Sequence, residues 1–336
     1  MRAIFETRRH GGSLRRLLAG AGALALLATG CASQQGESAA GGFPRQSLRI
    51  MAPAAPGGGW DQTSRELQGV LRGQTRKPVE VYNVGGAGGT VGLAQYVGRR
   101  GNPHELMTMG LIMAGAVETN HSRVRLDQVT PLARLTADYE VIVVPAKSSY
   151  QDMGDLADAM RDDVEAVSIA GGSAGGVEQI LAGMVAKAVG ADPSKVNYIA
   201  HSGGGEALTT ILSGRAKAGI SGISEISEQI EAGQVRALAV SSPQRQSAVD
   251  APTLREAGID VELANWRGIV APPGISKEDE AALERMLTEM ARTPQWRAVL
   301  ERRGWQDNFL AGDQFEQFMT TEQTRVHGVL DELGLI

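Results

Sequence analysis

The chain has 336 residues, of which 42% are hydrophobic and 21% are charged, and its formal net charge is −5. This length exceeds what one hydrophobic core usually organises, so we expect two lobes of ordinary domain size. The part of the chain that follows the N-terminal segment has no cluster of Lys or Arg interleaved with aromatic residues, which argues against nucleic-acid binding. The 43 glycines are the one marked compositional excess.

The N-terminal segment has the pattern of an export signal. Arginines between Arg2 and Arg16 precede an apolar run, 17–27, and small residues lead from there to Cys31, the only cysteine. The position of Cys31 resembles the bacterial lipobox, so we expect residues 1–31 to be a lipoprotein signal peptide with a lipid anchor on Cys31. Ordinary secretion is the alternative, and the export route, general or twin-arginine, stays open.

Residues 32–46 are rich in Ser, Gln and Gly and have few large apolar side chains, which predicts a flexible tether. The folded body should start near Ser47. No later stretch offers the ~18 consecutive apolar residues of a membrane-spanning helix. Passage of a solute through the membrane would therefore need another chain.

Four segments repeat one layout, a short β-prone run, a glycine-rich turn and an amphipathic helix, which is the βα unit of a parallel sheet. The strands are expected at 48–53, 79–83, 166–170 and 196–200, and the glycine loops at 57–59, 85–89, 171–176 and 202–205. Two units precede residue 145 and two follow it.

Two further β-prone runs, 140–145 and 235–240, are predicted to carry the chain between lobes. We expect a first lobe at 47–144, a second lobe at 145–240, and a return of 241–336 to the first lobe with C-terminal helices. The predicted fold class is α/β, with two lobes joined by a hinge, each a mixed and mostly parallel sheet flanked by helices.

A glycine turn at a helix start lets the backbone approach a ligand, and its free N–H groups and the helix dipole favour an anion there. In open α/β sheets ligands sit at the carboxyl ends of strands, where all four loops would lie. Two loops from each lobe would then converge on one cleft. The alternative is that these glycines only make tight turns.

The same glycines are also compatible with enzymatic motifs. The run Gly171-Gly172-Ser173-Ala174-Gly175 matches a nucleophile elbow, and Ser173, Asp260 and His327 follow the order of a serine hydrolase. A dinucleotide fingerprint at 86–91 fails because Val91 replaces the third glycine, and no phosphate-binding P-loop occurs. The histidines are scattered, so we expect neither a metal nor a cofactor, although His201 directly precedes a glycine loop.

At these loops the sequence resembles the TctC-type solute-binding proteins of tripartite tricarboxylate transporters, also called Bug proteins. The resemblance covers essentially the whole mature chain. It is carried by the segments 52–53, 56–61, 83, 85–92, 118–120, 171–176, 202–207, 266–268 and 271–272.

The resemblance implies a two-lobed periplasmic-binding fold that holds a carboxylate largely by backbone amides and ordered water. It places a first-lobe role on Gly57, Gly58, Gly59, Asp61, Gly88, Gly89 and Thr90, and a second-lobe role on Ser173, Ala174, Ser202 and Gly203. Two departures stand out. A histidine often follows the Ser173 loop in the family, whereas this helix opens with Val177-Glu178-Gln179, and an acid at Glu178 would repel a highly charged anion. Gly85 stands where a proline is frequent, which loosens that loop.

These expectations describe a lipid-anchored, extracytoplasmic receptor rather than an enzyme. It would be a monomer that captures a di- or tricarboxylate, or a related carboxylate, and delivers it to integral membrane permease subunits. A sensor that presents its closed form to a membrane receptor is the alternative. The sequence names neither the ligand nor the membrane that holds the anchor.

Overall fold

The computed structural model describes residues 43–336. The predicted signal peptide, Cys31 and most of the tether lie outside the described residues. The strands are β1 (Leu48–Ala52), β2 (Val79–Asn83), β3 (Glu105–Gly110), β4 (Thr130–Pro145), β5 (Ile169–Gly171), β6 (Tyr198–Ala200), β7 (Ala218–Gly222), β8 (Val235–Val240), β9 (Ala264–Ala271) and β10 (Gln306–Ala311).

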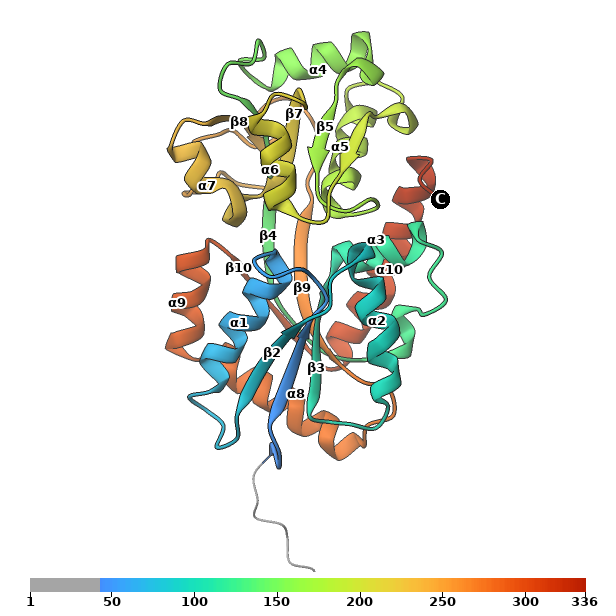
Figure 1. Ribbon diagram of the computed structural model, residues 1–336, viewed down its shortest axis with the longest axis vertical. Helices are drawn as coiled ribbons and strands as arrows, with labels where there is room; N and C mark the ends of the chain where they lie inside the picture. The colour runs from blue at the N-terminus through green and yellow to red at the C-terminus, as the bar shows by residue number, and fades with distance from the viewer. Residues whose placement is uncertain (1–42) are drawn as a thin grey trace, which may run out of the picture. The chain divides into compact units, whose positions relative to one another are not determined.

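The helices lie between these strands and after them (Figure 1). The α-helices are α1 (Gly59–Leu71), α2 (Thr90–Tyr96), α3 (Leu111–Thr119), α4 (Met153–Asp162), α5 (Val177–Ala188), α6 (Gly204–Leu212), α7 (Ile223–Glu231), α8 (Lys277–Ala291), α9 (Pro294–Arg303) and α10 (Asp313–Glu332). Short 3₁₀ turns are η1 (Ala87–Gly89), η2 (Val97–Arg99), η3 (Leu126–Gln128), η4 (Val164–Ala166) and η5 (Pro193–Lys195).

The strands form two lobes that share β4. In the first lobe β1 pairs in parallel with β2 and β3, and β9 continues the sheet antiparallel between β3 and β4. In the second lobe β5 pairs in parallel with β6 and β7, while β7 and β8 pair antiparallel with β4. The fold class is confirmed, and antiparallel pairs contribute more of each sheet than the βα pattern indicated.

Strand β4 passes from one lobe to the other. Its residues 130–139 pair with β9 in the first lobe, and its residues 140–145 pair with β7 and β8 in the second. The C-terminal part of the chain adds β9 and β10 to the first-lobe sheet, where β9 pairs with β3 and β10 pairs with β4. The predicted lobe boundaries themselves stay predictions.

Apolar side chains explain the layers around each sheet. Helices α8 and α9 bury Leu283, Leu287 and Trp296 against the first-lobe sheet, and α6 and α7 bury Ile211 and Ile226 against the second. A third cluster runs through both lobes and contains residues of α3, α5 and α10. The two lobes therefore share part of their hydrophobic core.

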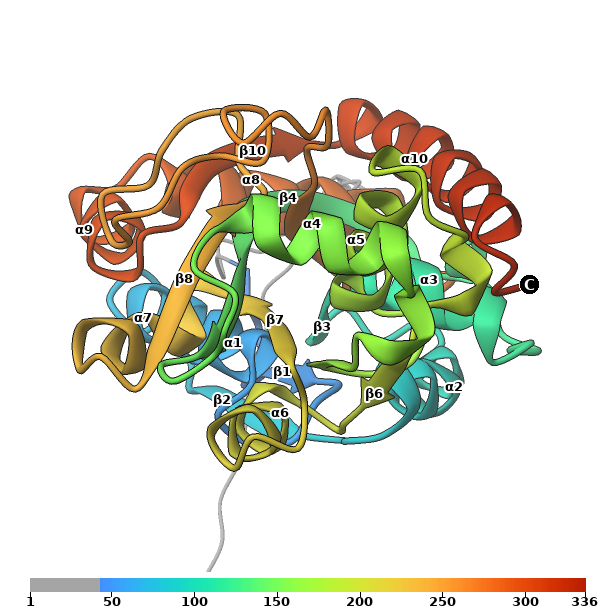
Figure 2. The ribbon, with the colours of Figure 1, turned by 90° about the horizontal axis from the view of Figure 1, so that it is seen from above.

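Helix α10 extends from the first lobe toward the second (Figure 1), and in the view from above it lies along one side of the molecule (Figure 2). It packs beside α3, and beyond its end the side chain of Leu333 lies against α5, where a Cβ at Gly183 would approach it to 2.7 Å. An ion pair of 2.5 Å joins Lys187 of α5 to Glu332. The C-terminal helix thus ties the lobes together beside the strands that connect them.

Candidate functional site

A pocket of about 680 Å³ lies between the lobes. First-lobe loops 53–59 and 85–89 form one wall, second-lobe loops 172–174 and 200–206 form the other, and β9 contributes Asn265 and Arg267. This volume is within the range of small-molecule sites. The four glycine loops predicted from the sequence therefore converge on one cleft.

Helices that begin at this pocket have glycine N-caps. Residues 58, 89, 110, 176, 203 and 222 precede α1, α2, α3, α5, α6 and α7, and none of these glycines provides a side-chain cap. Of the α-helices in residues 43–336 that begin elsewhere, α4, α8 and α9 are capped by Asp152, Ser276 and Thr293, and only α10 has a glycine N-cap, Gly312. First-turn N–H groups without a cap can bind an anion, so the cap pattern favours an anionic group in the pocket.

Some main-chain donors at the pocket are free. Among residues 43–336, the N–H groups of Ala87, Ala174 and Gly203 have no acceptor within the protein, and all three residues line the pocket. They come from both walls. A carboxylate in the pocket could accept hydrogen bonds from either lobe.

Most of the sequence-predicted site residues lie in the pocket wall: Gly58, Gly59, Gly88, Gly89, Ser173, Ala174, Ser202 and Gly203. Gly57, Asp61 and Thr90 do not line it. Gly88 has φ 60°, and a Cβ there would lie 2.4 Å from Cβ of Ala116, so only glycine fits. Thr90 is buried, and its hydroxyl donates to the carbonyl of Ala87 at 2.8 Å, which fixes the 85–89 loop.

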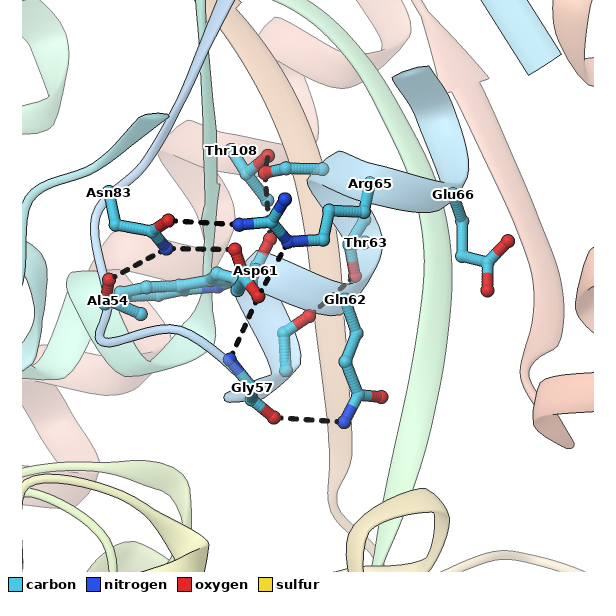
Figure 3. Close-up of polar contacts among 12 residues, drawn as sticks. Ala54, Gly57, Asp61, Gln62, Thr63, Arg65, Glu66, Asn83 and Thr108 are labelled. Atoms are coloured by element: carbon cyan, nitrogen blue, oxygen red, sulfur yellow. Dashed lines mark hydrogen bonds and ion pairs between the residues drawn. The ribbon is translucent and has the colours of Figure 1, made fainter. Parts of the chain in front are cut away.

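Asp61 holds the other first-lobe loop rather than facing the pocket (Figure 3). Its carboxylate accepts hydrogen bonds from Gly57 N at 2.8 Å, Asn83 Nδ2 at 2.8 Å and Arg65 Nε at 2.9 Å. Burial acts to raise the pKa of Asp61, but bonds from Arg65, Gly57 and Asn83 outweigh it and hold the pKa below its ordinary value. We infer that Asp61 positions the 57–59 loop.

The pocket also has charged walls that the glycine pattern does not reveal. Glu178, Glu206 and Glu225 line it, and Arg267 is the only Lys or Arg among the described residues that does. The departure at Glu178 therefore falls inside the site. His201 lines the pocket too, with Nδ1 3.1 Å from the Gly171 carbonyl and Nε2 2.8 Å from the Thr210 hydroxyl.

Four carboxyl groups and one guanidinium form a cluster where β4 crosses between lobes, and Glu178, Glu225 and Arg267 of this cluster line the pocket. Asp138 and Glu140 come from β4, Glu178 from α5, Glu225 from α7, and Arg267 from β9. Arg267 Nη2 lies 3.3 Å from Asp138 Oδ2, and both side chains are 2% exposed. One cation cannot balance four ionised carboxylates, so the cluster must retain protons or attract positive charge.

Burial is the first cause of the shifts within this cluster. It raises the pKa of Glu178 to about 7, with Glu225 adding to the effect and the backbone N–H groups of Glu178 and Gly172 opposing it. Burial and then the charge of Glu178 raise the pKa of Glu140 well above its ordinary value. The pKa values of Glu225 and Asp138 are raised by burial, against the opposing charge of Arg267.

The hydrolase alternative does not fit this geometry. Ser173 lines the pocket, but Asp260 and His327 do not. Asp260 is exposed and paired with Arg255 at 3.0 Å, while His327 is 3.3 Å from Glu118. The residues that the structure describes therefore do not assemble a Ser-His-Asp triad at Ser173.

Residues 43–336 contain neither a metal-site cluster nor a membrane-spanning helix. No group of three or more His, Cys, Asp or Glu side chains has the arrangement of a metal site. No helix in this range is both long and apolar enough to cross a membrane.

The fold is shared with solved solute-binding proteins. The structure of the periplasmic binding protein BugD has a TM-score of 0.76 at 22% identity and covers 87% of this chain and 99% of its own. MatC from Rhodopseudomonas palustris, solved with bound malate, has a TM-score of 0.75 at 22% identity and covers 86% of this chain and 100% of its own. These likenesses confirm the two-lobed periplasmic-binding fold.

Sequence comparisons lead to the family. Protein BugT of Bordetella pertussis is 25% identical over 302 residues, which are 87% of this chain and 90% of that protein. A family model described as "Tripartite tricarboxylate transporter family receptor" matches residues 63–335. The match takes in the 85–89 loop of the first wall and both loops of the second wall, and the chain belongs to this family of TctC-type solute-binding proteins.

Proposed function

We propose that this chain is an extracytoplasmic lipoprotein that captures a small organic acid between its lobes and presents it to integral membrane permease subunits. The observation that carries the proposal is the set of glycine-capped helix starts that open on one pocket from both lobes. A carboxylate held there would bridge the walls and favour the closed form.

The hydroxyls of Ser173 and Ser202, which also line the pocket, add to the free N–H groups of Ala87, Ala174 and Gly203 as donors for such a ligand. Each hydrogen bond to a charged group contributes roughly 1.5–3 kcal/mol. Four to six of them would give about micromolar affinity, which corresponds to roughly 8 kcal/mol, after the cost of ordering. Two structural neighbours support the ligand class, since one was solved with malate and an R. palustris protein was solved with adipate.

The binding experiment is a thermal-shift and calorimetry screen of purified protein with succinate, malate, citrate, adipate, glutamate and nicotinate. At least one carboxylate should raise the melting temperature. The Ala174→Trp variant should abolish the shift, because Ala174 is exposed and lines the pocket. Ala248→Trp, at an exposed position away from the pocket, is the control and should bind normally. Equal loss in both variants, or no shift with any carboxylate, would contradict the proposal.

We expect binding without turnover. The protein should release no product from ester or amide derivatives of a ligand that it binds, and Ser173→Ala should keep a normal fold. Product release by the wild type that Ser173→Ala abolishes would favour the hydrolase instead.

The anchor and the partners are proposed from the sequence and the family. Cys31 would carry the lipid, the mature protein would be a monomer, and a many-spanning permease would take the ligand. Cys31→Ala should move the protein from the membrane fraction to the soluble extracytoplasmic fraction. Unchanged membrane association of that variant would argue against the lipid anchor.

A further inference from the structure

One end of the pocket is rich in acceptors for hydrogen bonds, in contrast to the donors of the glycine loops. Glu178 is 8% exposed and Asn265 is 4% exposed, and both line the pocket. Among the described residues, Glu178 Oε2 and Asn265 Oδ1 have no hydrogen-bond partner. Buried polar atoms are rarely left unpaired, so these two oxygens point to a missing donor.

Glu140 adds to this acceptor-rich end from behind. Its side chain is fully buried, and its Oε1 accepts a hydrogen bond from Asn265 Nδ2 at 3.0 Å. Its Oε2 is also without a partner in the described part of the chain. Three elements, β4, α5 and β9, thus bring unpartnered oxygens to one side of the cleft.

The guanidinium of Arg267 is already engaged. It pairs with Asp138, its Nη1 lies 3.4 Å from the Thr63 hydroxyl, and it stacks over Trp305 at 5.2 Å. A Cβ at Gly59 would meet its Nη2 at 2.6 Å, so the group sits tightly behind the 57–59 loop. Its charge is therefore shared with protein carboxylates rather than reserved for a second anionic group of a ligand.

We propose that the ligand is a zwitterion, with a carboxylate at the free main-chain N–H groups of the glycine loops and an ammonium group at Glu178 and Asn265. The inference rests on the proposed function and narrows its ligand class. An ammonium supplies donors for the unpartnered oxygens and a positive charge for a cluster of four carboxyl groups. A dicarboxylate of the same length would place a second anion against Glu178.

Three matched pairs of probes separate these ligands: β-alanine and succinate, 4-aminobutyrate and glutarate, and 5-aminovalerate and adipate. Each pair shares a carboxylate and a methylene spacer and differs only at the far end. In at least one pair, calorimetry at pH 8 should show the amino acid binding about ten- to a hundredfold more tightly than the diacid. Tighter binding of every diacid would overturn the inference but leave the proposed function standing. Binding of neither member of any pair, with no carboxylate active in the wider screen, would overturn both.

The variant Glu178→Gln tests the assigned partner, since it removes the charge and keeps the shape. It should weaken the preferred amino acid about ten- to a hundredfold and leave the matched diacid unchanged or tighter. Glu206→Gln is the matched control, because Glu206 lines the pocket but is exposed. Its Oε2 accepts a hydrogen bond from Ser202 N at 3.1 Å. It should leave the ratio of the two affinities unchanged. A ratio that Glu178→Gln also leaves unchanged would overturn the assignment.

The pH profile of the unaltered protein gives a second readout that does not depend on a variant. The charged and titratable groups near Glu178 are Glu140 of β4, Tyr198 of β6, Glu225 of α7 and Arg267 of β9, and His201 lines the same pocket. Because the pKa of Glu178 is about 7, its ionised fraction grows from about pH 6 to about pH 8. Amino-acid affinity should rise over this range. A fall would show that a protonated Glu178 donates to the ligand, which the inference excludes.

Discussion

Asp61 shows how a residue can serve the site without facing it. Its carboxylate joins the loop residue Gly57 to Asn83 on β2 and Arg65 on α1. The sequence placed Asp61 beside the glycine turn, and the family resemblance gave it a ligand role. In the structure, all three hydrogen bonds of the Asp61 carboxylate are made with other groups of the protein. The side chain, on the first turn of α1, does not line the pocket.

Asp61→Asn should therefore loosen the 57–59 loop. Its amide would place a donor against groups that are themselves donors, and we expect a loss of about 1–3 kcal/mol in unfolding free energy. Urea unfolding monitored by circular dichroism measures this loss, and ligand affinity should fall with it. Asp260→Asn is the matched control because Asp260 is 92% exposed, and its midpoint should stay at the wild-type value. An equal loss in both variants would contradict the positioning role.

The charged cluster was the least predictable part of the site. Asp138 and Glu140 alternate along β4, a spacing that indicates a solvent-facing edge in most strands. Both are buried here, because α7 and β9 cover that face with Ser224, Asn265 and Arg267. Only the long-range pairing of β4 with β7 and β9 brings these groups together, and a local pattern contains no record of it.

Among the elements, strands formed by short β-prone runs were predicted best. The strands predicted before glycine loops at 48–53 and 79–83 are β1 and β2, and the β-prone run 235–240 is β8. The strand predicted at 166–170 starts later, at Ile169, because 164–166 form η4. Helix α3 was not predicted, since it is buried on nearly all sides and lacks amphipathic spacing. Strand β10 was missed because its residues are partly exposed and mostly polar at its start.

The end of α10 provides a test of how one element connects the lobes. Leu333 is 1% exposed and lies against Gly183 of α5. Leu333→Ala should cost about 2–4 kcal/mol of unfolding free energy and make the C-terminal helix easier to cleave. Denaturant unfolding and limited proteolysis measure these effects. Leu212→Ala, at a leucine that is 44% exposed, is the control, and a comparable loss there would refute the contact.

For the whole molecule, the buried carboxyl groups set a pH dependence. An acid with a raised pKa binds its proton more tightly in the native state than in the unfolded chain, so stability falls as pH rises from the unfolded to the folded pKa. For Glu178 this window lies between the ordinary glutamate pKa of 4.5 and the raised pKa of about 7. Glu140, Glu225 and Asp138 act in the same direction.

We therefore expect the ligand-free protein to lose stability on the order of 2 kcal/mol or more between about pH 5 and pH 8. Urea midpoints across this range measure the slope. Glu178→Gln should flatten it, while Glu206→Gln should keep it. Stability that rises with pH, or a loss of stability that is equally large in Glu178→Gln, would show that the cluster does not govern stability in this range.

Strand β4 has a consequence for how the molecule comes apart. Thermal unfolding of one lobe should unfold the other as well. The same 16-residue strand is an interior member of both sheets, and one apolar cluster is common to both lobes. Scanning calorimetry should record a single endotherm, with calorimetric and van't Hoff enthalpies in agreement. By the same reasoning, two fragments of the chain divided within β4 would each leave backbone hydrogen-bonding groups of a sheet without partners. Neither fragment, expressed alone, should fold as a native protein.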